Sequence, residues 1–183
     1  MTQRSSGESK TAENSKDFWR TWPGAIADAE KLIGLRMALD ACATNASVAV
    51  AGEFISPEQD ALSLDWTPFG SIGAVWCNPP FSLKAEFLQK AFEQAKKNRL
   101  VVCCMIPFEV ATGWWSDNVQ GKATFVFMPD GRYPFIHPET NELMRSPDFA
   151  TCFVVYTPFS VQTQYVPFQR IKPPKPVKLK SVE

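Results

Sequence analysis

The strongest pattern of hydrophobic and polar positions lies between Lys84 and Lys97. Apolar side chains recur there at helical spacing, with lysine and glutamate at the other positions, and they are Phe87, Leu88, Ala91, Phe92 and Ala95. This pattern predicts an amphipathic helix. A similar pattern predicts a helix from Pro23 to Ile33, because proline favours the first helical position and Gly34 follows the last apolar residue.

Uninterrupted apolar runs predict buried strands at 73–77 and 100–106, on either side of the helix at 84–97. A strand, a helix and a strand in this order predict a parallel pair with a right-handed crossover. Other segments are consistent with strands at 35–40, 123–128 and 149–156 and with helices at 45–51 and 111–119. The chain is therefore expected to form one α/β domain with a mostly parallel sheet.

Polar and turn-rich segments delimit this domain. Residues 1–16 lack periodicity and are expected to be a disordered N-terminal segment, and residues 17–169 form the predicted domain. Residues 170–183 are rich in lysine and proline, which predicts an extended basic tail. Residues 130–148 are predicted to form an insertion, an antiparallel hairpin near the edge of the sheet.

Composition argues against a membrane protein and against a zinc protein. No apolar run approaches the length of a membrane span, and residues 1–16 lack the apolar centre of a signal peptide. We therefore expect a cytoplasmic protein. The five cysteines lie mostly in apolar runs, and the chain has one histidine and no Cys-x-x-Cys pair. Reduced core thiols and no metal site are the expectation.

Charge is zero overall but unevenly distributed along the chain. Residues 21–169 carry ten basic and fifteen acidic side chains, whereas residues 170–183 carry five basic side chains and one acidic one. This balance argues against tight, nonspecific binding of DNA by the folded part. The basic tail could supply part of the missing positive charge.

The tetrapeptide Asn78-Pro79-Pro80-Phe81 follows the predicted strand at 73–77. Its two prolines hold the backbone extended, while the Asn78 amide oxygen and the Pro79 carbonyl can each accept a hydrogen bond from an amine. Phe81 can stack on a flat ring. Asp40 ends another predicted strand, and ligands bind at the carboxyl ends of parallel strands, so Asp40 and Asn78 are expected to flank one crevice. The alternatives are an ordinary proline loop and an Asp40 that caps a turn.

The tetrapeptide resembles the catalytic sequence (Asp/Asn/Ser)-Pro-Pro-(Tyr/Phe/Trp) of amino-group methyltransferases. The order of motifs around it is similar to that of phage-type, Dam-like DNA N6-adenine methyltransferases. These motifs span residues 17–156 and comprise an early Thr-Pro-like segment, LDACA, Asp-Ala-Leu, Asp-Trp, WCNPPF, VVCCMIP and a Gly-Arg-aromatic stretch.

The resemblance implies a Rossmann-like class I methyltransferase domain that uses S-adenosyl-L-methionine and acts on double-stranded DNA, in a phage or prophage setting. It implies catalytic roles for Asn78, Pro79, Pro80 and Phe81. The cofactor-binding residues that it implies are Thr21, Pro23, Asp40, Ala41, Cys42, Ala43, Asp60 and Asn78. Two features depart from the family pattern: no Phe-x-Gly-x-Gly loop follows the first strand, and Trp22 separates Thr21 from Pro23.

Arg132, Tyr133 and Arg145 in the insertion are expected to contact nucleic acid, since their side chains suit phosphates and base edges. The alternative is a hairpin with solvated charges. Two other functions also remain open at this point: methylation of another planar amine, such as an RNA base or a glutamine amide, and a catalytically silent methyltransferase-like module that binds nucleic acid.

Overall fold

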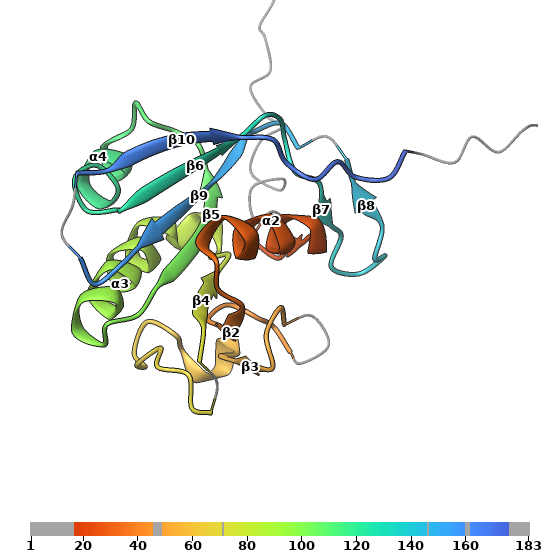
Figure 1. Cartoon of the computed structure of the whole chain (residues 1–183). Coiled ribbons are helices and arrows are strands. Elements are labelled where there is room, and N and C mark those ends of the chain that lie inside the picture. Colours follow the sequence, from red (N-terminus) through yellow and green to blue (C-terminus); the bar gives the residue numbers. More distant parts are fainter. Residues whose placement is uncertain (1–16, 46–48, 71, 146, 160–161, 176–183) are drawn as a thin grey trace, which may run out of the picture.

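The computed structural model describes residues 17–45, 49–70, 72–145, 147–159 and 162–175. They form a seven-stranded sheet in the order β10-β6-β9-β5-β4-β2-β3 and a small sheet in the order β1-β7-β8 (Figure 1). The strands of the large sheet are β2 (Met37–Asp40), β3 (Glu53–Phe54), β4 (Ala74–Cys77), β5 (Val102–Pro107), β6 (Phe125–Pro129), β9 (Thr151–Tyr156) and β10 (Gln164–Phe168). Those of the small sheet are β1 (Arg20–Thr21), β7 (Phe135–Ile136) and β8 (Leu143–Met144).

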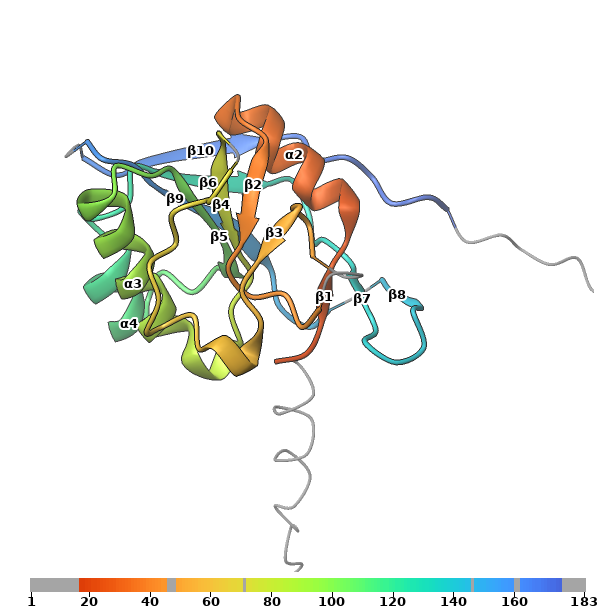
Figure 2. The ribbon, with the colours of Figure 1, turned by 90° about the horizontal axis from the view of Figure 1, so that it is seen from below.

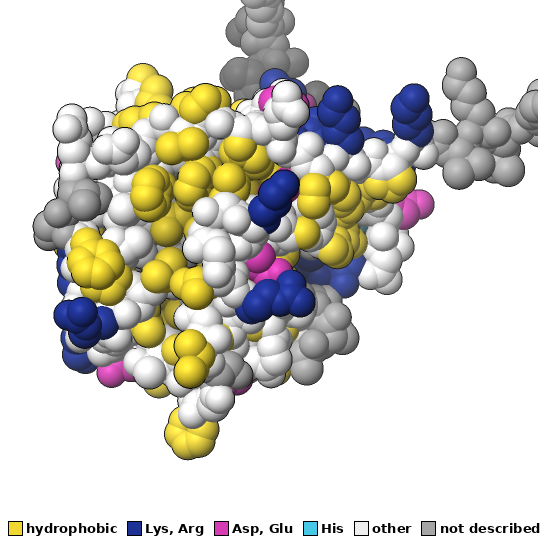
Figure 3. Space-filling model, viewed as in Figure 1, with side chains coloured by type: hydrophobic (Ala, Val, Ile, Leu, Met, Phe, Trp, Pro, Cys, Tyr) yellow, Lys and Arg dark blue, Asp and Glu magenta, His cyan; other side chains and the backbone are white. Residues whose placement is uncertain are grey.

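Three α-helices lie in the described part of the chain: α2 (Pro23–Ile33), α3 (Lys84–Lys97) and α4 (Gly113–Asn118). Two short 3-10 helices, η1 (Pro57–Gln59) and η2 (Phe81–Leu83), lie in loops. Helices α3 and α4 cover one face of the sheet, and α2 lies on the opposite face (Figures 1 and 2). Figure 3 shows apolar side chains on the face over β6, β9 and β10, beside α2.

The large sheet is mostly parallel, which confirms the predicted α/β class. Its antiparallel strand is β9, which pairs with β5 and β6 in the interior of the sheet. The antiparallel hairpin expected at the sheet edge is instead β7 and β8, which form the small sheet with β1. The hairpin follows the carboxyl end of β6 in the chain. Strand β9 therefore begins at that end of the sheet and runs antiparallel to β5 and β6.

Alternating strand residues build one apolar core on each face. In β4, Val75 and Cys77 pack in the cluster beneath α3 and α4, whereas Ala74 and Trp76 pack in the cluster beneath α2. Both faces of β4 are therefore buried, as its continuous apolar sequence predicts. The motif that follows β4 is therefore anchored to a strand that is buried on both faces.

The predicted helices at 23–33 and 84–97 are confirmed with the expected bounds. The helix considered at 45–51 is not present in its described part, where residue 45 and residues 49–51 lie in bends or unassigned backbone. Strand β10 was not predicted, because Pro167 and polar residues interrupt its apolar pattern. A proline is tolerated there because β10 is an edge strand.

The predicted N-terminal segment 1–16 and the last part of the predicted tail lie outside the described residues. Among the helices described, none has the length and apolar composition that a membrane crossing requires.

Candidate active site

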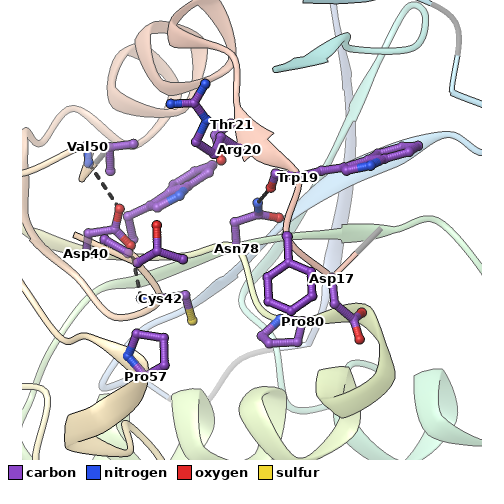
Figure 4. A pocket seen from close by; sticks show the side chains of 14 residues that line it. Asp17, Trp19, Arg20, Thr21, Asp40, Cys42, Val50, Pro57, Asn78 and Pro80 are labelled. Atoms are coloured by element: carbon purple, nitrogen blue, oxygen red, sulfur yellow. Dashed lines mark hydrogen bonds between the residues drawn. The ribbon is translucent and has the colours of Figure 1, made fainter. Parts of the chain in front are cut away.

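Asn78 stands at the carboxyl end of β4, where its side chain is held by a backbone group from the start of the chain. Its Nδ2 donates a hydrogen bond to the Trp19 carbonyl oxygen over 3.2 Å (Figure 4). A carbonyl only accepts, so this contact fixes which end of the amide faces Trp19. Asn78 Oδ1 is buried and has no hydrogen-bond partner. Because Asn78 lines a cavity, an acceptor without a hydrogen-bond partner belongs to the wall of this cavity.

Residues 17–21 form one wall of this cavity. The Asp17 carboxylate accepts hydrogen bonds from the Ser82 backbone N–H (3.1 Å) and the Ser82 hydroxyl (2.6 Å). Further along, β1 pairs with β7. The segment is thus attached to the Asn-Pro-Pro-Phe loop at Asp17 and Trp19, and to the small sheet at β1. Sequence reasoning did not identify Asp17 or Trp19, since these contacts join distant parts of the chain.

Asp40 ends β2 and is buried, with its carboxylate turned into the loop that follows. Oδ1 accepts the Cys42 N–H and Oδ2 accepts the Val50 N–H, each over 3.0 Å. Burial raises the pKa of Asp40 to about 6, although the hydrogen bonds from Val50 and Cys42 favour the charged form. Asp40 therefore fixes the backbone at Cys42 and Val50, and it is both a loop-capping residue and a component of the cavity.

Two adjacent cavities meet at Cys42, Pro57 and Pro80, which line both of them. The first has a volume of about 180 Å³ and is lined by Asp40 and Asn78 among others. The second has a volume of about 190 Å³ and extends past η1. Together they form a bipartite site at the carboxyl ends of β2 and β4, where open α/β sheets bind ligands.

The predicted cofactor residues are distributed over both cavities. Those lining the first are Thr21, Asp40, Cys42, Ala43 and Asn78. Those lining the second are Ala41, Cys42 and Asp60. Asp60 is exposed in a turn with φ 53°, and its Oδ1 accepts the Leu62 N–H over 3.2 Å.

Pro23 does not line either cavity of the bipartite site. It is the first residue of α2 and lines a separate hollow with Thr21 and Ile26. Trp22 lies between Thr21 and Pro23 in the sequence. Its ring covers Gly24, where an added Cβ would lie 2.1 Å from the indole, and it packs 6.2 Å from the Tyr133 ring.

Phe81 belongs to a cluster of aromatic rings beside the motif. Its ring meets Phe149 edge-on, at 5.2 Å between centroids and 89°, and Phe135 at 6.2 Å and 82°. Trp19 stacks on Phe149 at 6.0 Å and 17° and tilts against Phe135 at 5.5 Å. These contacts restrict the orientation of Phe81. Phe135 comes from the insertion and Phe149 directly follows it, and neither could be assigned to the site from the sequence.

The residues expected to contact nucleic acid differ in their accessibility. Arg132 and Arg145 are exposed, and each donates to a backbone carbonyl, of Pro147 and Pro174 respectively. Tyr133 is 1% exposed and donates its hydroxyl to Asp28 Oδ2 over 2.5 Å. Burial, and then the Asp28 carboxylate, raise the pKa of Tyr133. The expectation that Tyr133 contacts nucleic acid is therefore wrong, because the ring is part of the core.

All five cysteines are free thiols, as predicted, and four of them are buried. Cys42 Sγ and Cys77 Sγ lie 3.6 Å apart. Burial raises the pKa of both thiols, so they remain protonated and unreactive at neutral pH. The described residues contain no group of three or more His, Cys, Asp or Glu side chains arranged to hold a metal ion.

Comparison with known proteins identifies the family. The family described as DNA N-6-adenine-methyltransferase (Dam) matches residues 8–172. A DNA N-6-adenine-methyltransferase of Haemophilus phage HP1 is 28% identical, over 90% of this chain and 95% of its own length. One from Escherichia phage T1 is 26% identical, over 89% of this chain and 74% of its own length.

No solved structure matches the chain significantly. The family match extends over nearly the whole described part, including both cavities and the Asn-Pro-Pro-Phe loop. The chain therefore belongs to the DNA N-6-adenine-methyltransferase (Dam) family, the enzymes that methylate the N6 amine of adenine in DNA.

Proposed function

We propose that the protein methylates adenine N6 in double-stranded DNA, that S-adenosyl-L-methionine is the methyl donor, and that Asn78-Pro79-Pro80-Phe81 is the catalytic segment. The observation that carries this proposal is Asn78 Oδ1, a buried acceptor without a partner at the edge of a cavity. A buried, unsatisfied acceptor costs about 1–3 kcal/mol, and a bound amine would remove this cost.

The bipartite site fits S-adenosyl-L-methionine in its chemistry. The Asp40 carboxylate gives the first cavity negative charge, which suits a ligand with a sulfonium and an ammonium group. The second cavity combines apolar side chains, Ile55, Leu62 and Phe87, with Asp60, which suits an adenine ring and its amine. Thr21 and the backbone of residues 41–43 complete the proposed binding set. When bound, the cofactor supplies an electrophilic methyl group.

The catalytic segment acts on the adenine amine by accepting its hydrogens. The N6 lone pair is delocalised into the ring, so the free amine is a poor nucleophile. Hydrogen bonds from the two N–H groups to Asn78 Oδ1 and the Pro79 carbonyl favour a pyramidal, more nucleophilic nitrogen. The proton that N6 loses on methylation passes to water, because Asn78 Oδ1 and the Pro79 carbonyl accept hydrogen bonds but are too weak as bases to keep a proton. The main contribution of these groups is alignment of the reacting atoms.

Phe81 provides the surface on which the adenine ring stacks. Its contacts with Phe135 and Phe149 hold the ring before substrate arrives, which lowers the entropy lost on binding. In duplex DNA the adenine must be rotated out of the helix to reach this position. Arg132 and Arg145, both exposed on the insertion, are suited to contact phosphates beside the site.

The fold and the relatives support the finer assignments. A seven-stranded α/β sheet with one antiparallel interior strand and a ligand site at the carboxyl ends of β2 and β4 agrees with a class I methyltransferase domain. The similar proteins of Haemophilus phage HP1 and Escherichia phage T1 support a phage or prophage origin, with the bacterial cytoplasm as the place of action.

The test is to incubate the protein with tritiated S-adenosyl-L-methionine and separate pools of duplex DNA, single-stranded DNA, RNA and protein. We expect label in duplex DNA, recovered as N6-methyladenine after nucleoside digestion. Label confined to RNA or protein would show that the methyl acceptor is another planar amine and not adenine in DNA. Label only in single-stranded DNA would reject the duplex assignment.

A further inference from the structure

Residues 169–175, here called the C-terminal strap, are attached to the protein surface. The Ile171 N–H donates to Asp28 Oδ2 over 2.7 Å, and the Arg170 N–H donates to Asp130 Oδ1 over 3.1 Å. The Arg170 guanidinium also pairs with Asp130 at 3.7 Å. Past these contacts, the Pro174 carbonyl accepts a hydrogen bond from Arg145 Nη1 over 2.5 Å. The strap therefore runs from the end of β10 to the β7–β8 hairpin.

The strap changes the charge of the surface that it reaches. Residues 132–149 carry two arginines against three acidic side chains, Glu139, Glu142 and Asp148. The strap adds Lys172 and Lys175, which are both exposed. Within the described residues, the ion pairs join Arg36 with Glu30, Lys97 with Asp65 and Arg170 with Asp130. The charges of Arg145, Lys172 and Lys175 are thus not neutralised by those pairs.

Proline keeps these lysines in place. Pro173 and Pro174 lie between them, and each proline fixes its own φ and disfavours a helical residue before it. The strap is therefore extended, and both lysines are held near Arg145 by its hydrogen bond to Pro174. In Figure 3, basic side chains stand along this part of the molecule.

This surface is connected to the catalytic segment through short contacts. Strand β7 pairs with β1, whose residues line the first cavity, and the two lie beside β8 in Figure 2. Phe149, at the end of the hairpin region, stacks on Trp19, whose carbonyl holds Asn78. A duplex that delivers adenine to Asn78 would pass close to this hairpin.

We propose that Lys172 and Lys175 of the C-terminal strap, together with Arg145, form a phosphate-binding surface that holds duplex DNA beside the active site. This inference rests on the proposed function. It also explains how a protein with an acidic folded part binds a polyanion: the strap supplies the cations that the hairpin lacks.

The test measures binding of a fluorescein-labelled DNA duplex of mixed sequence by anisotropy over a series of KCl concentrations. For Lys172→Gln/Lys175→Gln, we expect weaker binding of the duplex. The slope of log Kd against the logarithm of the KCl concentration should be smaller by about 1.8, because each phosphate contact contributes about 0.9. Lys172→Arg/Lys175→Arg keeps the charges and should keep the wild-type slope. Lys90→Gln/Arg99→Gln, on and just after α3, is the matched control, since neither side chain is in one of the ion pairs above, and it should also leave the slope unchanged.

The outcomes separate this inference from the proposed function. A wild-type slope in Lys172→Gln/Lys175→Gln, from a wild-type protein that methylates duplex DNA, overturns the role of the strap and leaves the proposed function intact. A wild-type protein that neither binds nor methylates the duplex overturns the proposed function, and the strap proposal with it.

Discussion

Two polar residues of the proposed site, Asn78 and Asp40, are each oriented by backbone groups. Asn78 donates to the Trp19 carbonyl, and Asp40 accepts from the N–H groups of Cys42 and Val50. Their side chains are therefore fixed before ligands bind. Such preorganisation means that substitution should affect catalysis and pH dependence more than it affects folding.

Asn78→Ala should reduce methyl transfer by about 100-fold or more, because it removes the proposed acceptor of the adenine amine. The measurement is single-turnover methylation at saturating S-adenosyl-L-methionine. Asn78→Asp keeps an oxygen acceptor but loses the hydrogen bond to Trp19, so its rate should lie between those of wild type and Asn78→Ala. Urea unfolding of Asn78→Ala should stay within about 1 kcal/mol of wild type, because the variant loses the hydrogen bond to Trp19 but also removes a buried acceptor without a partner. Near-normal transfer by Asn78→Ala would disprove the mechanism.

Asp40 should make the stability of the protein fall as pH rises from about 4 to about 7. Its pKa is raised from 3.8 to about 6 in the folded protein, so the folded state binds more protons than the unfolded state in this range. The effect amounts to at most about 3 kcal/mol. Comparing urea unfolding of wild type and Asp40→Asn across this range should show the fall in wild type alone.

Asp117→Asn, an exposed change on α4, is the control for Asp40 and should follow wild type. Equal pH dependence in wild type and Asp40→Asn would show that Asp40 keeps an ordinary pKa. Protonation of Asp40 should also weaken the binding of S-adenosyl-L-methionine below about pH 6, because the neutral carboxylic acid no longer attracts a cationic ligand.

Among the secondary structure elements, β2 and β4 position the site, and their close approach depends on Gly73. A Cβ at this residue would lie 2.4 Å from the Arg36 carbonyl oxygen and 3.0 Å from the Ala38 Cβ. The first contact is with backbone, which cannot move aside as a flexible side chain can. The register that brings Asp40 beside Trp76, two residues before Asn78, therefore requires glycine immediately before β4.

Gly73→Ala should lower the free energy of unfolding by about 1–3 kcal/mol, the usual cost of overpacking. Because Gly73 lies at the amino end of β4 and the cavities lie at its carboxyl end, cofactor binding should change less than stability does. Thermal unfolding and S-adenosyl-L-methionine titration measure the two effects. Gly113→Ala at the start of α4 is the control, since no atom lies within 4 Å of its added Cβ. A Gly73→Ala protein as stable as Gly113→Ala would contradict this account.

Across the whole molecule, Asp28 joins three distant segments. This buried carboxylate on α2 accepts the Tyr133 hydroxyl from the insertion and the Ile171 N–H from the C-terminal strap. Helix α2 also follows β1, which lines the first cavity. The strap is thus coupled to the core of the domain as well as to the proposed DNA surface.

Tyr133→Phe should lower the free energy of unfolding by about 1–3 kcal/mol, because it removes one hydrogen bond to a buried carboxylate. A chain ending at Gln169 should lower it by at least as much, because it removes the Ile171 hydrogen bond to Asp28 together with the contacts of Arg170 and Pro174. The combination should deviate from additivity, since both changes act on Asp28. A chain ending at Lys175 keeps both contacts and should be as stable as the full chain. Strict additivity in urea unfolding would show that the two contacts are independent.

Local sequence was sufficient to predict α2, α3, the buried strands and the Asn-Pro-Pro-Phe segment, because helical periodicity, apolar runs and proline act over a few residues. The class of reaction also followed, since the ordered motifs around Asn78 are local sequences. The contacts of these elements could not be predicted in the same way. Trp19 and Asn78 are 59 residues apart, and no local sequence pattern predicts the hydrogen bond between them.

Packing between distant segments set the remaining features. Tyr133 lies in a polar segment yet is buried, because Asp28 on α2 accepts its hydroxyl. Edge strand β10 forms because β6 offers it a partner, despite Pro167. Contacts across the fold also determine that Asn78 Oδ1 has no hydrogen-bond partner. The same holds for the aromatic rings that contact Phe81 and for the path of the strap. Composition and periodicity do not encode such contacts locally, because their energy comes from surfaces that meet only after the chain has folded.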